Sequence, residues 1–267
     1  MNNKFTKNKI DDFIFYTDNR LTNFGVKHAF TTKFGGVSKG YFSSLNLSLT
    51  RNDDINDVLN NYKIVSKYLD LNYNRITITA QTHTKNVVVV DETNVGSGIL
   101  KPSFKDVDAL VTNLKDTPVF AFFADCVPII LYDFNKKVIS VVHSGWKGTA
   151  LEIVRFAVSK MISMFNSNPT DIIASIGPSI SQKNFEIDKL TMTKLSTIKN
   201  AKDCIIQNND KYYADLWALN KNILLDSKIP EENIEIIDIC TVDNADIFYS
   251  HRVSGDKRGN FAAIASL

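Results

Sequence analysis

Residues 127–144 read VPIILYDFNKKVISVVHS, and this stretch decides how the middle of the chain folds. Two runs rich in β-branched residues, 127–133 and 138–144, flank the polar segment 134–137. A connection of this length joins antiparallel neighbours, so we predict a β-hairpin.

The register of this hairpin places two chemically active side chains together. If Asp133 and Val138 face each other across the turn, residue 128 lies opposite residue 143. Cys126 and His143 then both fall at the open end of the hairpin, where their side chains can meet.

Short β-rich runs alternate with helical patterns along the rest of the chain, and no repeat or linker divides it. We therefore expect one domain, residues 1–267, of α+β or mixed α/β class. The predicted strands are 26–34, 75–80, 86–92, 108–113, 119–124, 127–133, 138–144, 171–177 and 234–239. The predicted helices are 56–69, 149–165, 188–198 and 215–227.

Composition limits the classes of function. With 267 residues and a formal charge of +2, the chain lacks the basic excess of a nucleic-acid or anionic-membrane surface. Its three cysteines include no CxxC pair, which favours a reducing, cytoplasmic location over a disulfide framework. The polar start MNNKFTKNKIDDF lacks the apolar h-region of a signal peptide, and no run of about 18 apolar residues occurs, so we expect neither secretion nor a membrane span.

A third candidate ligand, His83, stands in the segment QTHT just before the run NVVVV. Two imidazoles and one thiolate from His83, Cys126 and His143 form a three-ligand Zn²⁺ set, which leaves the fourth position for water or substrate. That is the pattern of a catalytic metal. The alternative interpretation makes Cys126 a small buried hydrophobe and each histidine a satisfied core residue.

The segment SGWKGT, residues 144–149, predicts an anion site. Lys147 is flanked by glycines just before a predicted helix, whose start is indicated by a capping box of Thr149 with Glu152. Free N–H groups and a flexible cation at that junction favour a phosphate or carboxylate. The alternative is a tight turn with a solvated lysine.

Nine segments together resemble the bacterial laccase-domain family, long labelled multicopper polyphenol oxidase and understood as zinc-dependent purine nucleoside phosphorylases that also deaminate adenosine. The matching segments are HAFTTKFGGVS (28–38), SSLNLSL (43–49), NDD (52–54), QTH (81–83), DALVTN (108–113), the hairpin with its flanks, IGPSIS (176–181), ADLWALN (214–220) and FYSHR (248–252).

The resemblance implies that His83, Cys126 and His143 are metal ligands and catalytic residues, with Lys147 as a phosphate contact. Asn46, Asp108 and Arg252 become candidates for substrate contacts, or else caps and loop residues. The implied fold is a layered sandwich of central mixed or antiparallel sheets flanked by helices, similar to the cytotoxic necrotizing factor catalytic fold.

The sequence also departs from the family's pattern. Lys33 and Lys147 replace usual arginines, so the charge is kept but the bidentate fork is lost. The usual Thr-Gly-Arg reads Arg258-Gly259-Asn260, and no functional arginine is carried onto position 260.

A laccase-type copper centre is implausible for this chain. Such a centre needs on the order of ten histidines, and the sequence has four. We therefore expect Zn²⁺, with Cu²⁺ binding only adventitiously because it out-competes Zn²⁺ at most N/S sites.

The activity implied is phosphorolysis of adenosine, inosine, guanosine or S-methyl-5′-thioadenosine, with adenosine deamination as a side activity. The expected partners are a purine nucleoside and phosphate, without nucleic acid or membrane, for a monomer or homodimer. Two alternatives remain open: a metal-independent hydrolase or deamidase that uses Cys126 with His143, and a purine- or metal-binding module without turnover.

Overall fold

A computed structural model describes residues 4–267, which form three sheets. The predicted mixed α/β class is confirmed. The first sheet runs in the order β1 (Phe5–Ile10), β2 (Phe13–Asp18), β3 (Lys27–Thr31), β15 (Phe261–Ser266), β7 (Val119–Phe123) and β4 (Thr77–Ile78). The second runs in the order β14 (Ile234–Ile236), β10 (Ile172–Ile176), β8 (Val127–Asp133), β9 (Val138–Ser144), β6 (Ala109–Thr112) and β5 (Val87–Val89).

The predicted central hairpin is confirmed in position and register. Strands β8 and β9 pair antiparallel, with Asp133 opposite Val138 and Pro128 opposite His143. All seven residues of each strand are buried. This explains why their sequences read as nearly continuous apolar runs, since both faces of the sheet are covered.

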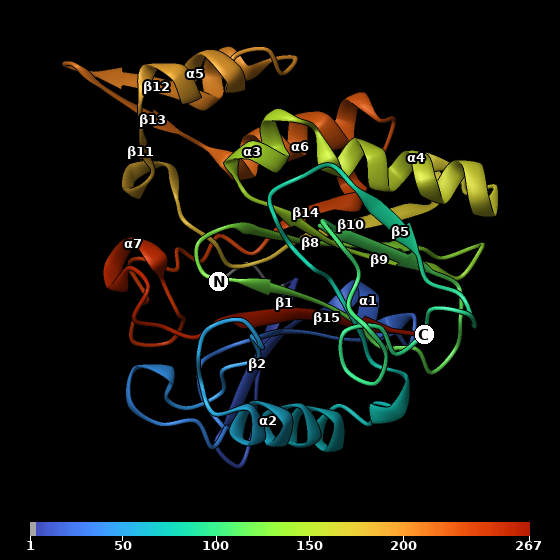
Figure 1. Ribbon diagram of the computed structural model, residues 1–267. Coiled ribbons are helices and arrows are strands. Elements are labelled where there is room, and N and C mark those ends of the chain that lie inside the picture. The colour runs from blue at the N-terminus through green and yellow to red at the C-terminus, as the bar shows by residue number, and fades with distance from the viewer. Residues whose placement is uncertain (1–3) are drawn as a thin grey trace.

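Four layers are stacked in Figure 1: helices α3, α4 and α6, then the second sheet, then the first sheet, then helix α2. The helices are α1 (Asn19–Asn23), α2 (Ile55–Tyr68), α3 (Trp146–Ala150), α4 (Ile153–Phe165), α5 (Lys189–Leu195), α6 (Leu216–Asp226) and α7 (His251–Ser254). One apolar cluster fills the space under α4 and α6, a second lies between the two sheets, and a third lies against α2. The helix patterns predicted for 56–69, 188–198 and 215–227 are confirmed within a few residues.

The predicted helix over 149–165 is wrong at its start. Helix α3 ends at Ala150, and Glu152 adopts a left-handed conformation with φ of 56° before α4 begins. The predicted capping box of Thr149 with Glu152 is therefore wrong. The Thr149 hydroxyl is instead 2.9 Å from the Ser144 hydroxyl and accepts from Asn220 Nδ2 at 3.2 Å, so it is not free to cap the helix.

Several elements lie outside the sequence-based prediction. They are β1, β2, the C-terminal strand β15, the short helices α1 and α7, and a small sheet in the order β11 (Glu186–Ile187), β13 (Lys211–Ala214) and β12 (Ile205–Asn208). In Figure 1 the small sheet and α5 stand above the rest of the molecule as a projection. Across residues 4–267, no helix has the length and apolar character needed to span a membrane.

Candidate metal centre and its pocket

The three predicted ligands converge. One ligand atom from each of His83, Cys126 and His143 lies within 4.8 Å of the other two. His143 is in β9, Cys126 directly precedes β8, and His83 lies in the segment between β4 and β5. The structure thus brings together residues that are far apart in sequence.

Cys126 is placed where the chain passes from one sheet to the other. Strand β7 ends at Phe123 in the first sheet and β8 begins at Val127 in the second. Asp125 makes the change of direction with φ of 85°. Its carboxylate accepts hydrogen bonds from Thr241 Oγ1 at 2.7 Å and from Arg252 N at 2.6 Å, and these contacts anchor the crossover.

His143 is fully buried and held at two points by one residue. Its backbone N–H donates to Asp108 O at 2.8 Å, and its Nδ1 lies 2.8 Å from Asp108 Oδ1. Burial opposes protonation of the ring, but the charge of Cys126 and hydrogen bonds to Asp108 and Cys126 outweigh it and raise the pKa of His143 to about 9. Because Nδ1 is used by Asp108, Nε2 is the nitrogen directed at the sulfur.

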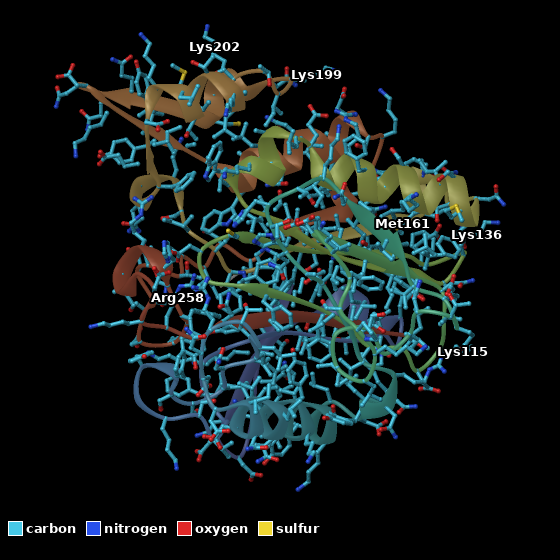
Figure 2. The ribbon with its side chains drawn as sticks, in the orientation of Figure 1. Lys115, Lys136, Met161, Lys199, Lys202 and Arg258 are labelled. Atoms are coloured by element: carbon cyan, nitrogen blue, oxygen red, sulfur yellow. The ribbon has the colours of Figure 1, made fainter. Side chains whose placement is uncertain are left out.

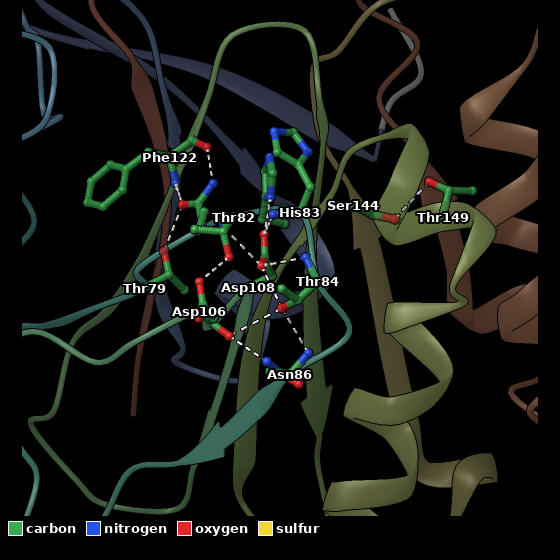
Figure 3. Close-up of polar contacts among 12 residues, drawn as sticks. Thr79, Thr82, His83, Thr84, Asn86, Asp106, Asp108, Phe122, Ser144 and Thr149 are labelled. Atoms are coloured by element: carbon green, nitrogen blue, oxygen red, sulfur yellow. Dashed lines mark hydrogen bonds and ion pairs between the residues drawn. The ribbon is translucent and has the colours of Figure 1, made fainter. Parts of the chain in front are cut away.

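Asp108 also fixes the segment that carries His83 (Figure 3). Its carboxylate accepts from the backbone N–H groups of Thr82 at 3.2 Å, His83 at 3.0 Å and Thr84 at 2.8 Å, and from Thr84 Oγ1 at 2.8 Å. Burial would raise the pKa of Asp108, but its bond to His143 and those to Thr84 lower it to about 2. One ionised carboxylate therefore positions two of the three candidate ligands.

His83 is presented by a sharp turn. Its backbone is left-handed, with φ of 63°, which is unusual for a residue with a side chain. Its ring packs edge-on against that of His143, with 4.9 Å between the ring centroids. Partial burial, followed by the charges of His143 and Lys147, lowers the pKa of His83 to about 4, so its imidazole is neutral at pH 7 and able to bind a metal.

Gly145 leaves open the space that these ligands surround. A Cβ added there would lie 2.7 Å from His83 Nδ1 and 2.9 Å from Cys126 Sγ, which is closer than atoms can pack. A site with two imidazoles, one thiolate and room between them fits a borderline-soft cation such as Zn²⁺. The residues therefore fit the metal that the sequence predicted.

A cavity of about 540 Å³ opens beside the ligand set and is large enough for a nucleoside. His83, Cys126 and His143 all line it, together with the aromatic rings of Phe104 and Phe122. Gln81, another lining residue, is fixed by hydrogen bonds to both backbone groups of Phe122, at 2.6 and 2.7 Å. The wall therefore presents apolar surface beside polar groups.

The other predicted site residues do not line this cavity. Lys147 is exposed on α3, with its ammonium 5.6 Å from the centre of the Trp146 ring. Asn46 is buried behind the wall, where its Oδ1 accepts from the N–H groups of Ser48 and Asn260. Arg252 donates to two carbonyl groups, Asn184 O at 2.9 Å and Glu186 O at 3.3 Å.

Two arginines of the cavity wall, Arg51 and Arg258, lie outside the sequence-based prediction. Neither stands in a local motif that indicates burial. The one sequence signal is that Arg258-Gly259-Asn260 replaces the family's usual Thr-Gly-Arg. This signal marks the segment as unusual, but it does not predict that Arg258 lines the same cavity as Cys126.

Comparison with known proteins finds relatives over most of the chain. A family model described as multi-copper polyphenol oxidoreductase laccase matches residues 27–267. The chain is 35% identical over 242 residues to the purine nucleoside phosphorylase YlmD of Bacillus subtilis (strain 168), covering 89% of this chain and 87% of the relative. It is 31% identical over 237 residues to the adenosine deaminase RL5 of an unknown prokaryotic organism, covering 86% of this chain and 90% of the relative.

A solved structure extends the similarity to the whole fold. The crystal structure of Bacillus licheniformis hypothetical protein YfiH superposes with a TM-score of 0.93 at 30% identity, covering 99% of both chains. The family match over most of the sequence and the shared fold lead to one conclusion: the chain belongs to the multi-copper polyphenol oxidoreductase laccase family.

Proposed function

We propose that the chain is a purine nucleoside phosphorylase with adenosine deaminase as a second activity, and that both reactions use a Zn²⁺ held by His83, Cys126 and His143. The observation that carries this proposal is the convergence of the three ligands at the wall of a nucleoside-sized cavity. The names of the relatives YlmD and RL5 support the two activities.

The residues of the chain prepare this site for chemistry. Asp108 orients the ring of His143, so that Nε2 faces the ligand space, and holds His83 through its backbone N–H. The cavity wall holds the nucleoside and limits its access to water. A bound Zn²⁺ supplies Lewis acidity and lowers the pKa of a bound water toward about 7.

Phosphorolysis balances without any further reactant. An oxygen of hydrogen phosphate forms a bond to C1′ of the ribose as the bond from C1′ to the purine nitrogen breaks. The bonding electron pair leaves with the base, and the proton of hydrogen phosphate ends on the base. The products are a free purine and ribose 1-phosphate.

Four predicted substrate contacts remain proposals of different strength. Asp108 is fully engaged with ligand-bearing residues, which supports a positioning role. Asn46 can shape the wall through Asn260, and Arg252 can do so through Asp125. Lys147 is the sequence-based candidate for a phosphate contact, and its positive charge contributes to the lowered pKa of His83.

A metal-free alternative is supported by the closeness of Cys126 and His143, whose side-chain ligand atoms lie within 4.8 Å of each other, which suits a thiolate nucleophile with its base. This reading corresponds to the predicted similarity to the cytotoxic necrotizing factor deamidases.

Metal analysis combined with base release from inosine, with and without phosphate, tests the proposal. We expect one Zn²⁺ per chain, phosphate-dependent hypoxanthine release and inhibition by a chelator. Chelator-insensitive turnover by metal-free protein would favour the cysteine hydrolase, and stoichiometric zinc without turnover would favour a binding module.

A further inference from the structure

Arg258 is a buried cation in the wall of the cavity that His83, Cys126 and His143 also line. It is 5% exposed, and Figure 2 shows it beside α7. A guanidinium in such a place is costly unless its charge and its five N–H groups are matched. Its partners therefore decide whether it is a structural residue or part of an incomplete site.

Those partners are few and neutral. Nη1 donates to Gly259 O at 3.0 Å and to Asn260 Oδ1 at 2.9 Å. Nη2 lies 3.4 Å from His251 Nδ1, but that nitrogen also lies 3.0 Å from Gly255 O and cannot accept from Arg258 while it donates to this carbonyl. Nε has no partner, and within residues 4–267 no carboxylate forms an ion pair with Arg258.

The unmatched groups of Arg258 lie on one edge of the guanidinium. Nε–H and the nearer N–H of Nη2 point in the same direction and form the fork that binds two oxygens of a phosphate or carboxylate. Nη1, on the other side, is the nitrogen that the protein already occupies. The protein thus occupies the Nη1 side of the Arg258 guanidinium and leaves the edge formed by Nε and Nη2 available to an anion.

Arg51 adds a second cation to the same wall. Its Nε donates to Asn260 Oδ1 at 3.3 Å, so one amide oxygen holds both arginines. Its ion pair is with Asp256, whose side chain is 87% exposed and therefore neutralises it poorly. Burial, followed by the charge of Arg51, lowers the pKa of Arg258 to about 10, which still leaves it cationic at neutral pH.

We propose that Arg258, assisted by Arg51, binds the phosphate co-substrate in this cavity. The inference rests on the proposed phosphorylase function and names the residues that serve it. An anion at the fork would satisfy the unmatched donors and reduce the repulsion between the two arginines. The phosphate and a nucleoside would then share the cavity that the three candidate metal ligands line. Lys147, the sequence-based candidate, is exposed and does not line the cavity.

The test uses metal-loaded protein and two readouts. The first is the phosphate concentration that gives half-maximal hypoxanthine release from inosine. The second, independent of turnover, is the rise in melting temperature on adding inorganic phosphate. Arg258→Gln removes the charge and fork, Arg258→Lys keeps the charge alone, and Arg155→Gln is a matched control, because Arg155 is paired with Glu152 and Asp226 outside the cavity.

We expect Arg258→Gln to raise the required phosphate concentration about tenfold to a hundredfold, since it loses a bidentate charge-assisted contact. Arg258→Lys should recover only part of this loss. The control Arg155→Gln should require the same phosphate concentration as the wild type. Without phosphate, Arg258→Gln should melt no lower than the wild type, because the variant removes an unpaired buried charge. The stabilisation by phosphate should shrink in the Arg258 variants alone.

The assignment would be overturned if Arg258→Gln required no more phosphate than the wild type, or if Lys147→Ala raised the required phosphate concentration and Arg258→Gln did not. It would also be overturned if Arg258→Gln melted at a lower temperature and lost its metal, which would make Arg258 a structural residue. Failure of the proposed function is distinguishable from these. If base release by the wild type does not depend on phosphate, the proposed phosphorolysis is wrong. The rise in melting temperature with phosphate, and its dependence on Arg258, would still show whether Arg258 binds an anion.

Discussion

Each of the two large sheets buries one histidine, and the two rings are in very different chemical states. His28 in β3 is 3% exposed and His143 in β9 is 4% exposed. Both nitrogens of His28 are used by backbone groups: Nε2 accepts from Asp18 N and Nδ1 donates to Val26 O, both at 2.8 Å. His143 has a carboxylate on Nδ1 and directs Nε2 toward a thiol.

The pKa values of the two buried rings shift in opposite directions because their partners differ. Burial lowers the pKa of His28, and its contacts with the backbone and the charge of Asp18, which raise the pKa, do not outweigh burial. For His143, burial is outweighed by the charges and hydrogen bonds of Cys126 and Asp108, which raise its pKa. A strand histidine is therefore structural when both nitrogens are used by the backbone, and a ligand candidate when a carboxylate orients one and frees the other.

The largest effect is expected when one of the three candidate ligands, such as His143, is replaced. His143→Ala, His83→Ala and Cys126→Ser should each abolish zinc retention and nucleoside turnover, because two protein ligands hold Zn²⁺ weakly. Metal content after dialysis and base release measure this. His28→Gln is the matched control and should keep both. Zinc and activity retained in Cys126→Ser would show that the ligand assignment is wrong.

Asp108→Asn tests the carboxylate that distinguishes the two histidines. The amide can accept with one oxygen, but its NH₂ group would face the N–H groups that now donate to Oδ2. We expect zinc affinity to fall about tenfold to a hundredfold, measured by competition with a chelator. Asp106→Asn is the control, because Asp106 Oδ1 accepts from Thr82 Oγ1 and touches no ligand. Equal losses in both variants would contradict the positioning role.

The sequence could predict the parts of this site that depend on local pattern. The hairpin register follows from strand length and turn, so Pro128 opposite His143 was predictable. The role of Asp108 was not, because it depends on β6 lying beside β9, which brings together residues 35 apart in sequence. Sequence reasoning named Asp108 as a substrate contact, whereas the structure surrounds it with ligand-bearing residues.

Tertiary contacts also explain what the sequence missed. Thr149 and Glu152 have the spacing of a capping box, but a buried bond to Ser144 occupies Thr149 and the chain turns at Glu152. Arg258 would ordinarily be placed on a surface, since an arginine is seldom buried without a carboxylate. Both cases depend on partners that are distant in sequence.

His28→Gln is also expected to change stability, and this effect is smaller than those expected at the metal site. Glutamine cannot reproduce both backbone contacts of the ring, so Asp18 N or Val26 O loses its partner. We expect the free energy of unfolding to fall by about 1–3 kcal/mol, measured by urea denaturation. Loss of zinc at unchanged stability would instead connect His28 to the site and remove the contrast with His143.

The smallest expected effect is the pH dependence that His28 adds to stability. Its folded pKa is depressed, so above about pH 6.5 the ring is neutral in both states and contributes no slope. As the pH falls below this value, the unfolded chain takes up a proton that folded His28 accepts only at lower pH, and stability is lost. Between pH 7.5 and 5.5 the wild type should lose more stability than His28→Gln, measured by urea denaturation of both proteins. Other titrating groups cancel in this difference because both proteins contain them. Parallel pH profiles for the two proteins would mean that His28 is protonated in the folded state, and the two buried histidines would then be alike in charge despite their different partners.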